Sequence, residues 1–431
     1  MAVKPLRCSL LLTTQELDFQ GLSFALTEDL GAALSRVLAA SPRCSLCVLP
    51  SLELPITSLH LTHSLTLQGS PGTVLRLSGS VVVEASVRLC ELTLVADSTL
   101  EQALIQCSAD LELSDCSLLG ASQVVARDCC VSITSCRFGE GTIGVEAQRA
   151  AVQLERCSFS KQTQAGLELE DCQVGLQSCS FVRLQACGVV LKKCSSIFIE
   201  DCTFDRVQKS ALLIQGSEQS ANVTLRKNRV SSCGEDGLVL KGVKGEVLIS
   251  SNNVEGLGGS SCRLECLRGN VLLEVNSWVH CSGYGLFVLD APARIENCQC
   301  YEMRLGGLLL APGEQELSVV RSVAAGNQEF ALCVVLSSGS VLVEGCNFAS
   351  NPNDGVRVID LDERAEGRLE LRRCRVQRNR GYGLLVTGAG VVLVDSQVEH
   401  NGLADVAAKA RDLVLSEGPV SVLQPTSCFL L

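Results

Sequence analysis

Apolar and polar positions alternate along this chain in short runs that return at a nearly constant spacing. The repeated run reads apolar-x-apolar-x-x-(Cys or Asn)-x-apolar. Clear copies are VSITSCRF at 131–138, VQLERCSF at 152–159, VGLQSCSF at 174–181 and IFIEDCTF at 197–204. Alternation with a period of two residues is typical of a β-strand with one buried face. The pattern therefore predicts a strand at each copy.

The sixth position of the run measures the repeat. It occurs thirteen times over the 280 residues from Cys116 to Ser396, so its twelve intervals average about 23 residues. A fixed period in this range indicates a solenoid. The occupants are Cys116, Cys136, Cys157, Cys179, Cys202, Asn228, Asn252, Asn276, Cys298, Ser322, Cys346, Cys374 and Ser396.

A second run, in which a glycine precedes apolar residues, lies between the copies. It appears as AGLELE at 165–170, CGVVLK at 187–192, DGLVLK at 236–241, YGLFVL at 284–289, GGLLLA at 306–311 and YGLLVT at 382–387. Each repeat then holds two or three strands separated by turns, with no room for a helix. One repeat cannot bury its own apolar face, so successive coils must stack. We expect an all-β, single-stranded parallel β-helix, a solenoid of about 14 coils.

The repeat resembles that of the right-handed parallel β-helix family, whose pectate-lyase-like coils read I-x-I-x-x-N-x-I-x-x-N followed by G-I-x-L. The resemblance covers roughly residues 45–400. Cys replaces the first Asn in most coils, which exchanges a hydrogen-bonded ladder for a small apolar one. At the second Asn we expect a left-handed turn conformation, which Asn tolerates. This position is filled by Asn327, Asn351, Asn379 and Asn401.

The resemblance is specific for the fold and nearly silent on activity. The family includes pectate lyases, polysaccharide epimerases and non-enzymatic repeats in F-box and Shc-binding spindle proteins. The repeat motif of this chain most resembles that of these non-enzymatic proteins.

The two ends depart from the repeat, so we expect three segments: residues 1–44, 45–402 and 403–431. The first contains a predicted helix over 27–40, which begins after Thr27 and stops before Pro42. This helix would cover the open first coil, and the alternative is a helix that binds a partner. The third segment would form a C-terminal cap and tail. The apolar face of the helix is made of Leu30, Leu34, Val37 and Leu38.

Charge and cysteine content limit the setting. The 431 residues carry a net charge of −11, which argues against a nucleic-acid binder. The 25 cysteines are an odd number and cannot all pair within the chain. Because no signal-peptide core is evident, we expect a cytoplasmic, reducing compartment. The pair Cys44 and Cys47 has no further ligand at zinc spacing, so we expect no metal and no cofactor.

Candidate catalytic carboxylates do not group in the pattern. β-Helix enzymes that act on sugars use paired carboxylates, or Arg or Lys with bound calcium, on the exterior of one sheet. Here the candidates stand at turns beside Gly, where Asp ordinarily supports the backbone. The chain also has only one Trp and three Tyr for stacking on sugars. We therefore predict no catalytic residues and no enzyme. The candidates are Glu235, Asp236, Asp354, Asp360, Asp362 and Glu363.

An apolar stripe is expected on the outside of the second strand, two residues after its Gly. Of ten positions, Glu168, Glu265 and Arg357 are charged and the other seven are apolar. Such a stripe requires a cover, either a partner protein or a loop or tail of the chain itself. The predicted interface is Val190, Leu213, Val239, Phe287, Leu309, Cys333 and Leu385.

Basic residues cluster late in the chain. They could bind an acidic partner, for instance a tubulin-like or phosphorylated surface, or form a solvated face. The predicted basic patch is Arg368, Arg372, Arg373, Arg375, Arg378 and Arg380, preceded by Arg364.

The chain ends in Cys428-Phe-Leu-Leu431, which resembles a prenylation signal whose terminal Leu favours geranylgeranyl transfer. Membrane contact is expected only if Cys428 carries this lipid, because no Lys or Arg precedes it to supply a second membrane signal. The alternative is a buried strand that contains Val420, Val422, Phe429 and Leu430.

These observations lead to one functional prediction and one alternative. The prediction is a non-catalytic scaffold that binds a partner protein along one sheet face, in a cytoskeletal or ciliary assembly by resemblance alone. The alternative is a carbohydrate-active lyase, hydrolase or epimerase. A scaffold needs a flat apolar or charged wall, whereas an enzyme needs a groove with convergent charged groups.

Overall fold

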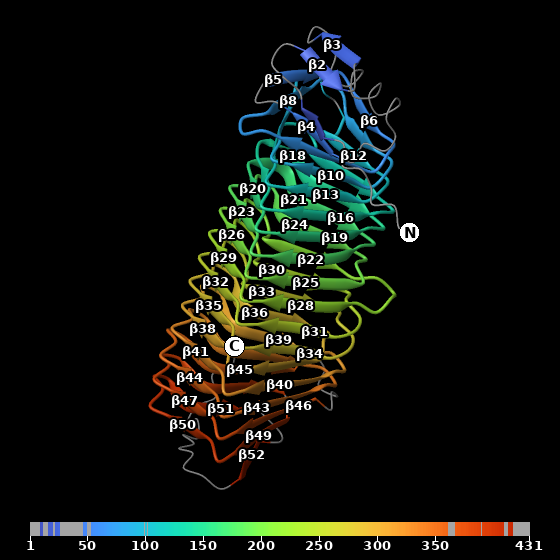
Figure 1. Ribbon diagram of the computed structural model, residues 1–431. Coiled ribbons are helices and arrows are strands. Elements are labelled where there is room, and N and C mark those ends of the chain that lie inside the picture. The colour runs from blue at the N-terminus through green and yellow to red at the C-terminus, as the bar shows by residue number, and fades with distance from the viewer. Residues whose placement is uncertain are drawn as a thin grey trace. The chain divides into compact units, whose positions relative to one another are not determined.

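The computed structural model describes residues 9–11, 16–19, 22–25, 46–49, 53–98, 100, 102–360, 367–388, 390–408 and 413–416. The chain divides into two compact units, residues 1–203 and 204–431. The described residues of both contain strands and no helix (Figure 1). The predicted all-β solenoid is thus confirmed, with about 15 turns. The helix expected over 27–40 lies outside the described residues.

Each coil contributes one strand to each of three parallel sheets, which we call sheets A, C and D. In each unit a strand pairs with its counterpart one coil away; β16 (Cys130–Thr134), for example, pairs with β19 (Ala151–Glu155). The first repeated run of the sequence forms sheets A and C, and the second run forms sheet D. Sheet B is the antiparallel hairpin of β2 (Glu16–Phe19) and β3 (Leu22–Ala25).

Unit 1 carries the following strands. Sheet A contains β1 (Ser9–Leu11), β4 (Leu46–Leu49), β7 (Leu65–Gly69), β10 (Val87–Cys90), β13 (Leu111–Ser114), β16, β19, β22 (Gln173–Gln177) and β25 (Ser196–Glu200). Sheet C contains β5 (Glu53–Ile56), β8 (Val74–Leu77), β11 (Thr93–Ala96), β14 (Ser117–Leu119), β17 (Arg137–Phe138), β20 (Ser158–Ser160) and β23 (Ser180–Val182). Sheet D contains β6 (Leu59–Leu61), β9 (Val81–Val83), β12 (Ile105–Cys107), β15 (Val124–Arg127), β18 (Gly141–Gln148), β21 (Gln162–Glu170) and β24 (Cys187–Lys192).

Unit 2 repeats the arrangement, and β26 (Thr203–Asp205) begins one residue before it. Sheet A contains β28 (Asn222–Arg226), β31 (Val247–Ser250), β34 (Val271–Glu274), β37 (Ala293–Glu296), β40 (Glu316–Val320), β43 (Ser340–Glu344), β46 (Arg368–Arg372), β49 (Gly390–Val394) and β52 (Leu413–Ser416). Sheet C contains β29 (Arg229–Ser231), β32 (Asn253–Glu255), β35 (Ser277–Val279), β38 (Gln299–Tyr301), β41 (Val323–Ala325), β44 (Asn347–Ala349), β47 (Arg375–Gln377) and β50 (Gln397–Glu399). Sheet D contains β27 (Leu212–Gln215), β30 (Leu238–Lys241), β33 (Cys262–Glu265), β36 (Tyr284–Leu289), β39 (Gly306–Ala311), β42 (Phe330–Leu336), β45 (Asp354–Asp360), β48 (Tyr382–Thr387) and β51 (Ala404–Ala408).

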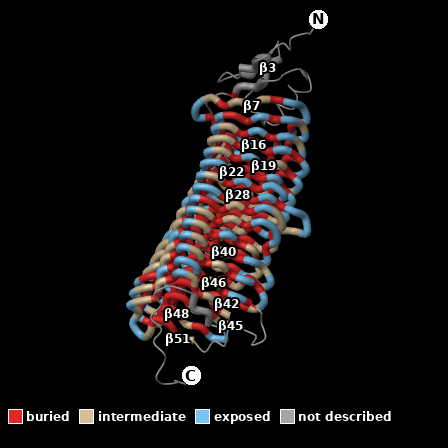
Figure 2. The backbone as a smooth tube through the Cα atoms, turned by 90° about the horizontal axis from the view of Figure 1, so that it is seen from below, coloured by how far each residue is buried: buried red, intermediate tan, exposed pale blue. Residues whose placement is uncertain are grey.

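Inside the coils, alternate residues of most strands between β6 and β51 form the core (Figure 2). Phe138, Phe159 and Phe181 stack in successive coils of unit 1, with ring centres 4.5 and 4.8 Å apart. In unit 2, Trp278 is fully buried. Because the inward residues of one coil lie against those of the next, the stacked coils bury what one coil would leave exposed.

The sixth-position cysteines point inward, as predicted: Cys136, Cys157, Cys179 and Cys202 are all buried. Their thiols also hydrogen-bond, which the pattern did not indicate. The backbone N–H of Cys116 donates to Cys136 Sγ at 3.3 Å, and that thiol donates to the Thr134 carbonyl. Cys therefore makes the same kinds of contact as Asn at this position.

The Asn residues at this position, in unit 2, form a conventional ladder. The backbone N–H and side-chain amide of Asn228 both donate to Asn252 Oδ1, at 2.9 and 3.0 Å. Asn252 donates in the same way to Asn276, at 3.0 Å for each bond. Each Asn thus donates to the Oδ1 of the Asn one coil further on, so these polar groups are paired inside the core.

The left-handed conformation occurs one residue before the second Asn position, not at the Asn itself as the sequence predicts. Positive φ angles occur at Ser350, Arg378 and His400, each directly before an Asn. The Asn side chains point into the core, where the Asn351 side-chain amide donates to Asn379 Oδ1 at 2.7 Å. The turn residue itself points outward, so its identity is less restricted.

The predicted segment boundaries at residues 44 and 402 stay predictions, and β51 and β52 are strands that follow the second one. Among the described residues, no helix has the length and apolar character that a membrane span requires. The tail with Cys428, and the pair Cys44 and Cys47, include residues outside the described ranges.

Candidate functional site

The predicted stripe lies on the exterior of sheet D. Val190 belongs to unit 1, and the other six residues belong to unit 2. In the register of unit 2 the row runs Leu213, Val239, Arg263, Phe287, Leu309, Cys333, Arg357 and Leu385. Arg263 therefore occupies the position expected for Glu265, which lies two residues further along β33. Val239 and Cys333 are buried, while Phe287, Leu309 and Leu385 are half-buried. Whether the row is an interface stays a prediction.

An aromatic cluster interrupts this row. The Tyr284 ring centre lies 6.0 Å from that of Phe287 and 6.0 Å from that of Phe330. Tyr284 and Phe330 begin β36 and β42, and β39 between them begins with Gly306. A Cβ at Gly306 would lie 2.4 Å from the Phe330 ring, so the glycine leaves the space that the ring fills.

Two arginines flank the aromatic cluster. Arg263 Cζ lies 5.0 Å from the Phe287 ring centre, and Arg357 Cζ lies 5.5 Å from that of Phe330. Both distances are within the range of cation–π attraction. The contacts form one continuous chain in which guanidinium groups stand on either side of three rings.

Beyond Arg263 lies a group of charged side chains. Arg263 pairs with Glu265 and, at 3.7 Å, with Asp236. Lys241 Nζ lies 3.0 Å from Glu265. Partial burial acts to raise the pKa of Glu265, but the hydrogen bonds from Lys241 and Arg263 outweigh it and lower that pKa. Glu265 is thus held ionised, and two cations stand beside Asp236 and Glu265.

Beyond Arg357 lies a nearly buried carboxylate. Asp354 is 3% exposed and accepts hydrogen bonds from Arg357 Nη2 at 2.8 Å and from the Tyr382 backbone N–H at 3.0 Å. Asp236 accepts the equivalent backbone bond from Ser260 at 2.6 Å. Two of the carboxylates found in the sequence therefore sit at opposite ends of the aromatic cluster. Among the others, Asp362 and Glu363 lie outside the described residues.

Pattern reasoning missed Tyr284 and Phe330. Both stand directly before the small residue of the second run, as YGL at 284 and FAL at 330. That shared position was the available signal. The burial of the Tyr284 ring raises the pKa of its hydroxyl, so the phenol stays protonated at neutral pH.

The predicted basic patch is spread over several elements. Arg368 and Arg372 lie on β46 and both pair with Glu370, at 3.8 and 2.5 Å. Arg373 pairs with Glu344. Arg375 lies on β47 of sheet C, and Arg378 and Arg380 follow it. Arg364 lies outside the described residues, and the role of the patch stays a prediction.

No group of three or more His, Cys, Asp or Glu among the described residues is placed to hold a metal ion. A family model for the right-handed β-helix region matches residues 102–265 and 267–414. The comparison with curated proteins finds no match.

Solved structures similar to the chain include the periplasmic alginate epimerase AlgG, at 9% identity and a TM-score of 0.37, over 86% of this chain and 85% of that one. The catalytic unit of a GH87 α-1,3-glucanase from Streptomyces thermodiastaticus matches at 12% identity and a TM-score of 0.40, over 91% and 66%. The A-module of the mannuronan C-5 epimerase AlgE4 from Azotobacter vinelandii matches at 14% identity and a TM-score of 0.28, over 92% and 95%.

The comparisons go against the prediction of a non-catalytic scaffold and of a chain that is not an enzyme. The similar structures are carbohydrate-active enzymes, which is the class held as the alternative. At identities of 9–14% and TM-scores of 0.28–0.40 they carry no argument about the activity of this chain, so the function has to be argued from its own residues.

Proposed function

The chain belongs to the right-handed β-helix family, and from that premise we propose that it is a carbohydrate-active protein that binds and processes an acidic polysaccharide on sheet D of unit 2. The observation that carries the proposal is the aromatic cluster of Tyr284, Phe287 and Phe330 between Arg263 and Arg357. Sugar rings stack their C–H faces on such aromatic rings, and guanidinium groups bind carboxylates.

The spacing of this face suits a polymer that runs across the strands. Arg263 on β33 and Arg357 on β45 are four strand spacings apart, about 19 Å. The rings lie between them. An extended chain of several sugar residues would therefore contact both guanidinium groups while its middle residues stack on the half-buried rings of Tyr284 and Phe287. Phe330 is only 6% exposed, so it supports the Tyr284 ring and does not contact the sugar.

The charged residues favour elimination or epimerisation over hydrolysis. Hydrolysis needs two carboxyl groups about 5–10 Å apart, one with a raised pKa. Asp236 and Asp354 are about five strand spacings apart, roughly 24 Å, and the pKa of Glu265 is lowered.

Abstraction of a proton next to a sugar carboxylate needs a base and nearby cations that stabilise the developing negative charge. In an elimination the electron pair left on C5 forms the C4–C5 double bond as the bond from C4 to the glycosidic oxygen breaks, and that oxygen takes a proton from water. In an epimerisation C5 instead takes a proton from water on its opposite face. Arg263 and Lys241 are the cations. Asp236 is the base in this proposal, because it touches Arg263 only at 3.7 Å whereas Glu265 is bound by both cations.

The test uses the full chain with polygalacturonate and alginate as probes. Unsaturated products are followed by ultraviolet absorbance, and epimerisation by proton exchange into deuterated water. Asp236→Asn should lower turnover by about 100-fold or more while binding persists. Phe287→Ala should weaken binding by roughly tenfold, since a stacked aromatic surface is lost. Phe198→Ala, at an exposed ring on β25 of unit 1, is the matched control. Full turnover by Asp236→Asn would refute the assignment of the base, and unchanged binding by Phe287→Ala would refute the site.

Several expectations from the sequence stay proposals. The cysteine content supports a reducing, cytoplasmic setting, and the charge argues against nucleic acid as a ligand. The resemblance to the repeats of F-box and Shc-binding spindle proteins rests on the repeat motif alone. Lipid attachment at Cys428 is likewise a proposal, and intact-mass measurement of the native protein tests it.

A further inference from the structure

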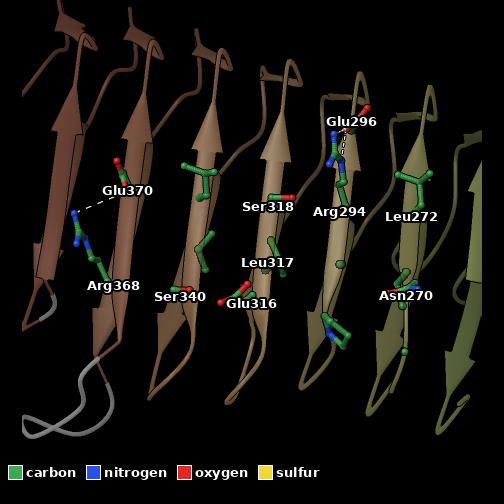
Figure 3. Close-up of a pocket in the computed structure, with 16 residues that line it drawn as sticks. Asn270, Leu272, Arg294, Glu296, Glu316, Leu317, Ser318, Ser340, Arg368 and Glu370 are labelled. Atoms are coloured by element: carbon green, nitrogen blue, oxygen red, sulfur yellow. Dashed lines mark hydrogen bonds and ion pairs between the residues drawn. The ribbon is translucent and has the colours of Figure 1, made fainter. Parts of the chain in front are cut away.

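A groove on the exterior of sheet A in unit 2 forms a second concave surface. It encloses about 950 Å³ and crosses β34, β37, β40, β43 and β46 (Figure 3). The aromatic cluster belongs to a different sheet, sheet D, and shares no residue with this groove.

Two arginines mark the groove on strands three spacings apart. Arg294 lies on β37 and Arg368 on β46, with side chains 65% and 56% exposed. Their carboxylate partners, Glu296 and Glu370, are only 15% and 19% exposed. A ligand that enters the groove would therefore meet these two guanidinium groups before their paired carboxylates, although the exposed Glu316 also lines the groove.

Each of these carboxylates has a second guanidinium partner outside the groove. Arg321 lies 3.5 Å from Glu296, and Arg372 lies 2.5 Å from Glu370. The hydrogen bond from Arg372 lowers the pKa of Glu370, which keeps it ionised. Because the second guanidinium shares the carboxylate, Arg294 and Arg368 keep donors for a further anion.

Two serine hydroxyl groups lie on the two strands between the arginines. Ser318 on β40 is opposite Arg294, and Ser340 on β43 is opposite Arg368. Arg294, Ser318, Ser340 and Arg368 thus lie on four successive strands, as Figure 3 shows. Glu316, opposite Ser340, adds an acceptor for hydroxyl groups.

The occupant cannot be an added β-strand. Each strand from β37 to β43 already pairs on both sides, so the sheet offers no free backbone edge in the groove. Only side chains are available to contact a ligand in the groove. These side chains repeat at the strand spacing of about 4.8 Å, which is close to the length of one extended sugar residue. This favours a linear glycan that carries carboxylates over a peptide.

We propose that this groove is a second binding site for an acidic polysaccharide, in which Arg294 and Arg368 bind sugar carboxylates and Ser318 and Ser340 bind hydroxyl groups of the residues between. The proposal rests on the proposed function of sheet D and adds a site to it. A polymer held at two places on one unit gains affinity because the second contact is intramolecular.

The experiment measures hexagalacturonate binding by calorimetry, with Asp236→Asn as the inactive background so that the probe is not consumed. We expect two binding events per chain. Arg294→Gln with Arg368→Gln should abolish one of them, or weaken it by about tenfold or more, because two charge-assisted contacts are lost. The fold should survive, since Glu296 and Glu370 keep Arg321 and Arg372.

The matched control is Arg375→Gln with Arg380→Gln, which removes two exposed arginines of unit 2 that lie outside the groove. It should leave both binding events. Uncharged cellohexaose should not bind in the groove. Loss of the same event in both double variants would overturn the proposal, as would Arg294-dependent binding of polyglutamate in place of the glycan.

The two proposals fail differently. If Phe287→Ala removes all binding and Arg294→Gln with Arg368→Gln removes none, the groove is not a site and the proposed function stands. If no variant and no parent chain binds hexagalacturonate, the function on sheet D fails and the groove proposal fails with it.

Discussion

Arg357 lies between a ring and a carboxylate: its guanidinium stands 5.5 Å from the centre of Phe330 and donates to Asp354 at 2.8 Å. Asp354 is also bound by the Tyr382 backbone N–H, one coil further on. Asp354 therefore holds the Arg357 side chain in place relative to the next coil. This arrangement fixes one end of the aromatic cluster.

Replacing Asp354 by Ala should destabilise unit 2 by about 1–3 kcal/mol, because the Tyr382 N–H and Arg357 lose a nearly buried acceptor. The measurement is urea unfolding followed by the fluorescence of Trp278, the single tryptophan. Glu218→Ala, which removes a fully exposed partner of Lys244, is the control and should change nothing measurable. Equal unfolding midpoints for Asp354→Ala and the parent chain would contradict the role assigned to Asp354.

Native thiols should label in two classes. Cys136, Cys157, Cys179 and Cys202 are buried and should react only after unfolding, whereas the exposed Cys130 should react at once. Alkylation of the native protein followed by mass spectrometry separates the classes. Rapid labelling of the four ladder thiols would show that the register is wrong.

Stability should fall in alkaline solution. Burial raises the pKa values of Cys194, Cys233 and Cys298 from 9.0 to about 11. The unfolded chain then releases these protons first as the pH rises, so the folded state loses stability progressively between about pH 9 and pH 11. Unfolding free energies measured across this range test the sign. A free energy that rises from pH 9 to pH 11 would contradict it.

The ladder position should tolerate Cys better than Ala. Asn252→Ala removes the Oδ1 that accepts from both the Asn228 N–H and its side-chain amide, which should cost about 2–4 kcal/mol. Asn252→Cys should cost less, since Cys136 Sγ accepts the equivalent N–H of Cys116. Denaturant unfolding of the two variants gives the comparison. An Ala variant as stable as the Cys variant would mean that the thiol is only a spacer.

The sequence predicts the strands and the inward cysteines because both repeat with the coil. It does not predict the aromatic cluster, since Tyr284 and Phe330 meet only through two stacked coils and the space left by Gly306. A residue at the start of a strand also has too few neighbours for alternation to assign its side.

The arginines late in the chain are close together in the sequence but lie apart in the structure. They look like one patch in sequence, yet the turn after β46 sends Arg368 and Arg375 to different sheets. The partner of Arg368 across the groove is Arg294, three strands earlier. Neighbours in a solenoid are set by the coil period, so closeness along the chain is a poor guide to a shared surface.

The Asn ladder also indicates where this chain can accept added sequence. Asn327 and Asn351 are 24 residues apart, and Asn351 and Asn379 are 28 apart, yet the side-chain bonds measure 3.2 and 2.7 Å. The longer coil has seven residues between β45 and β46, where the coil before it has three between β42 and β43. Four extra residues thus leave the rungs in place. Sequence grafted between β45 and β46 would enter shortly before Arg368, the first residue of β46, so an insertion there is suited to tuning what reaches the groove.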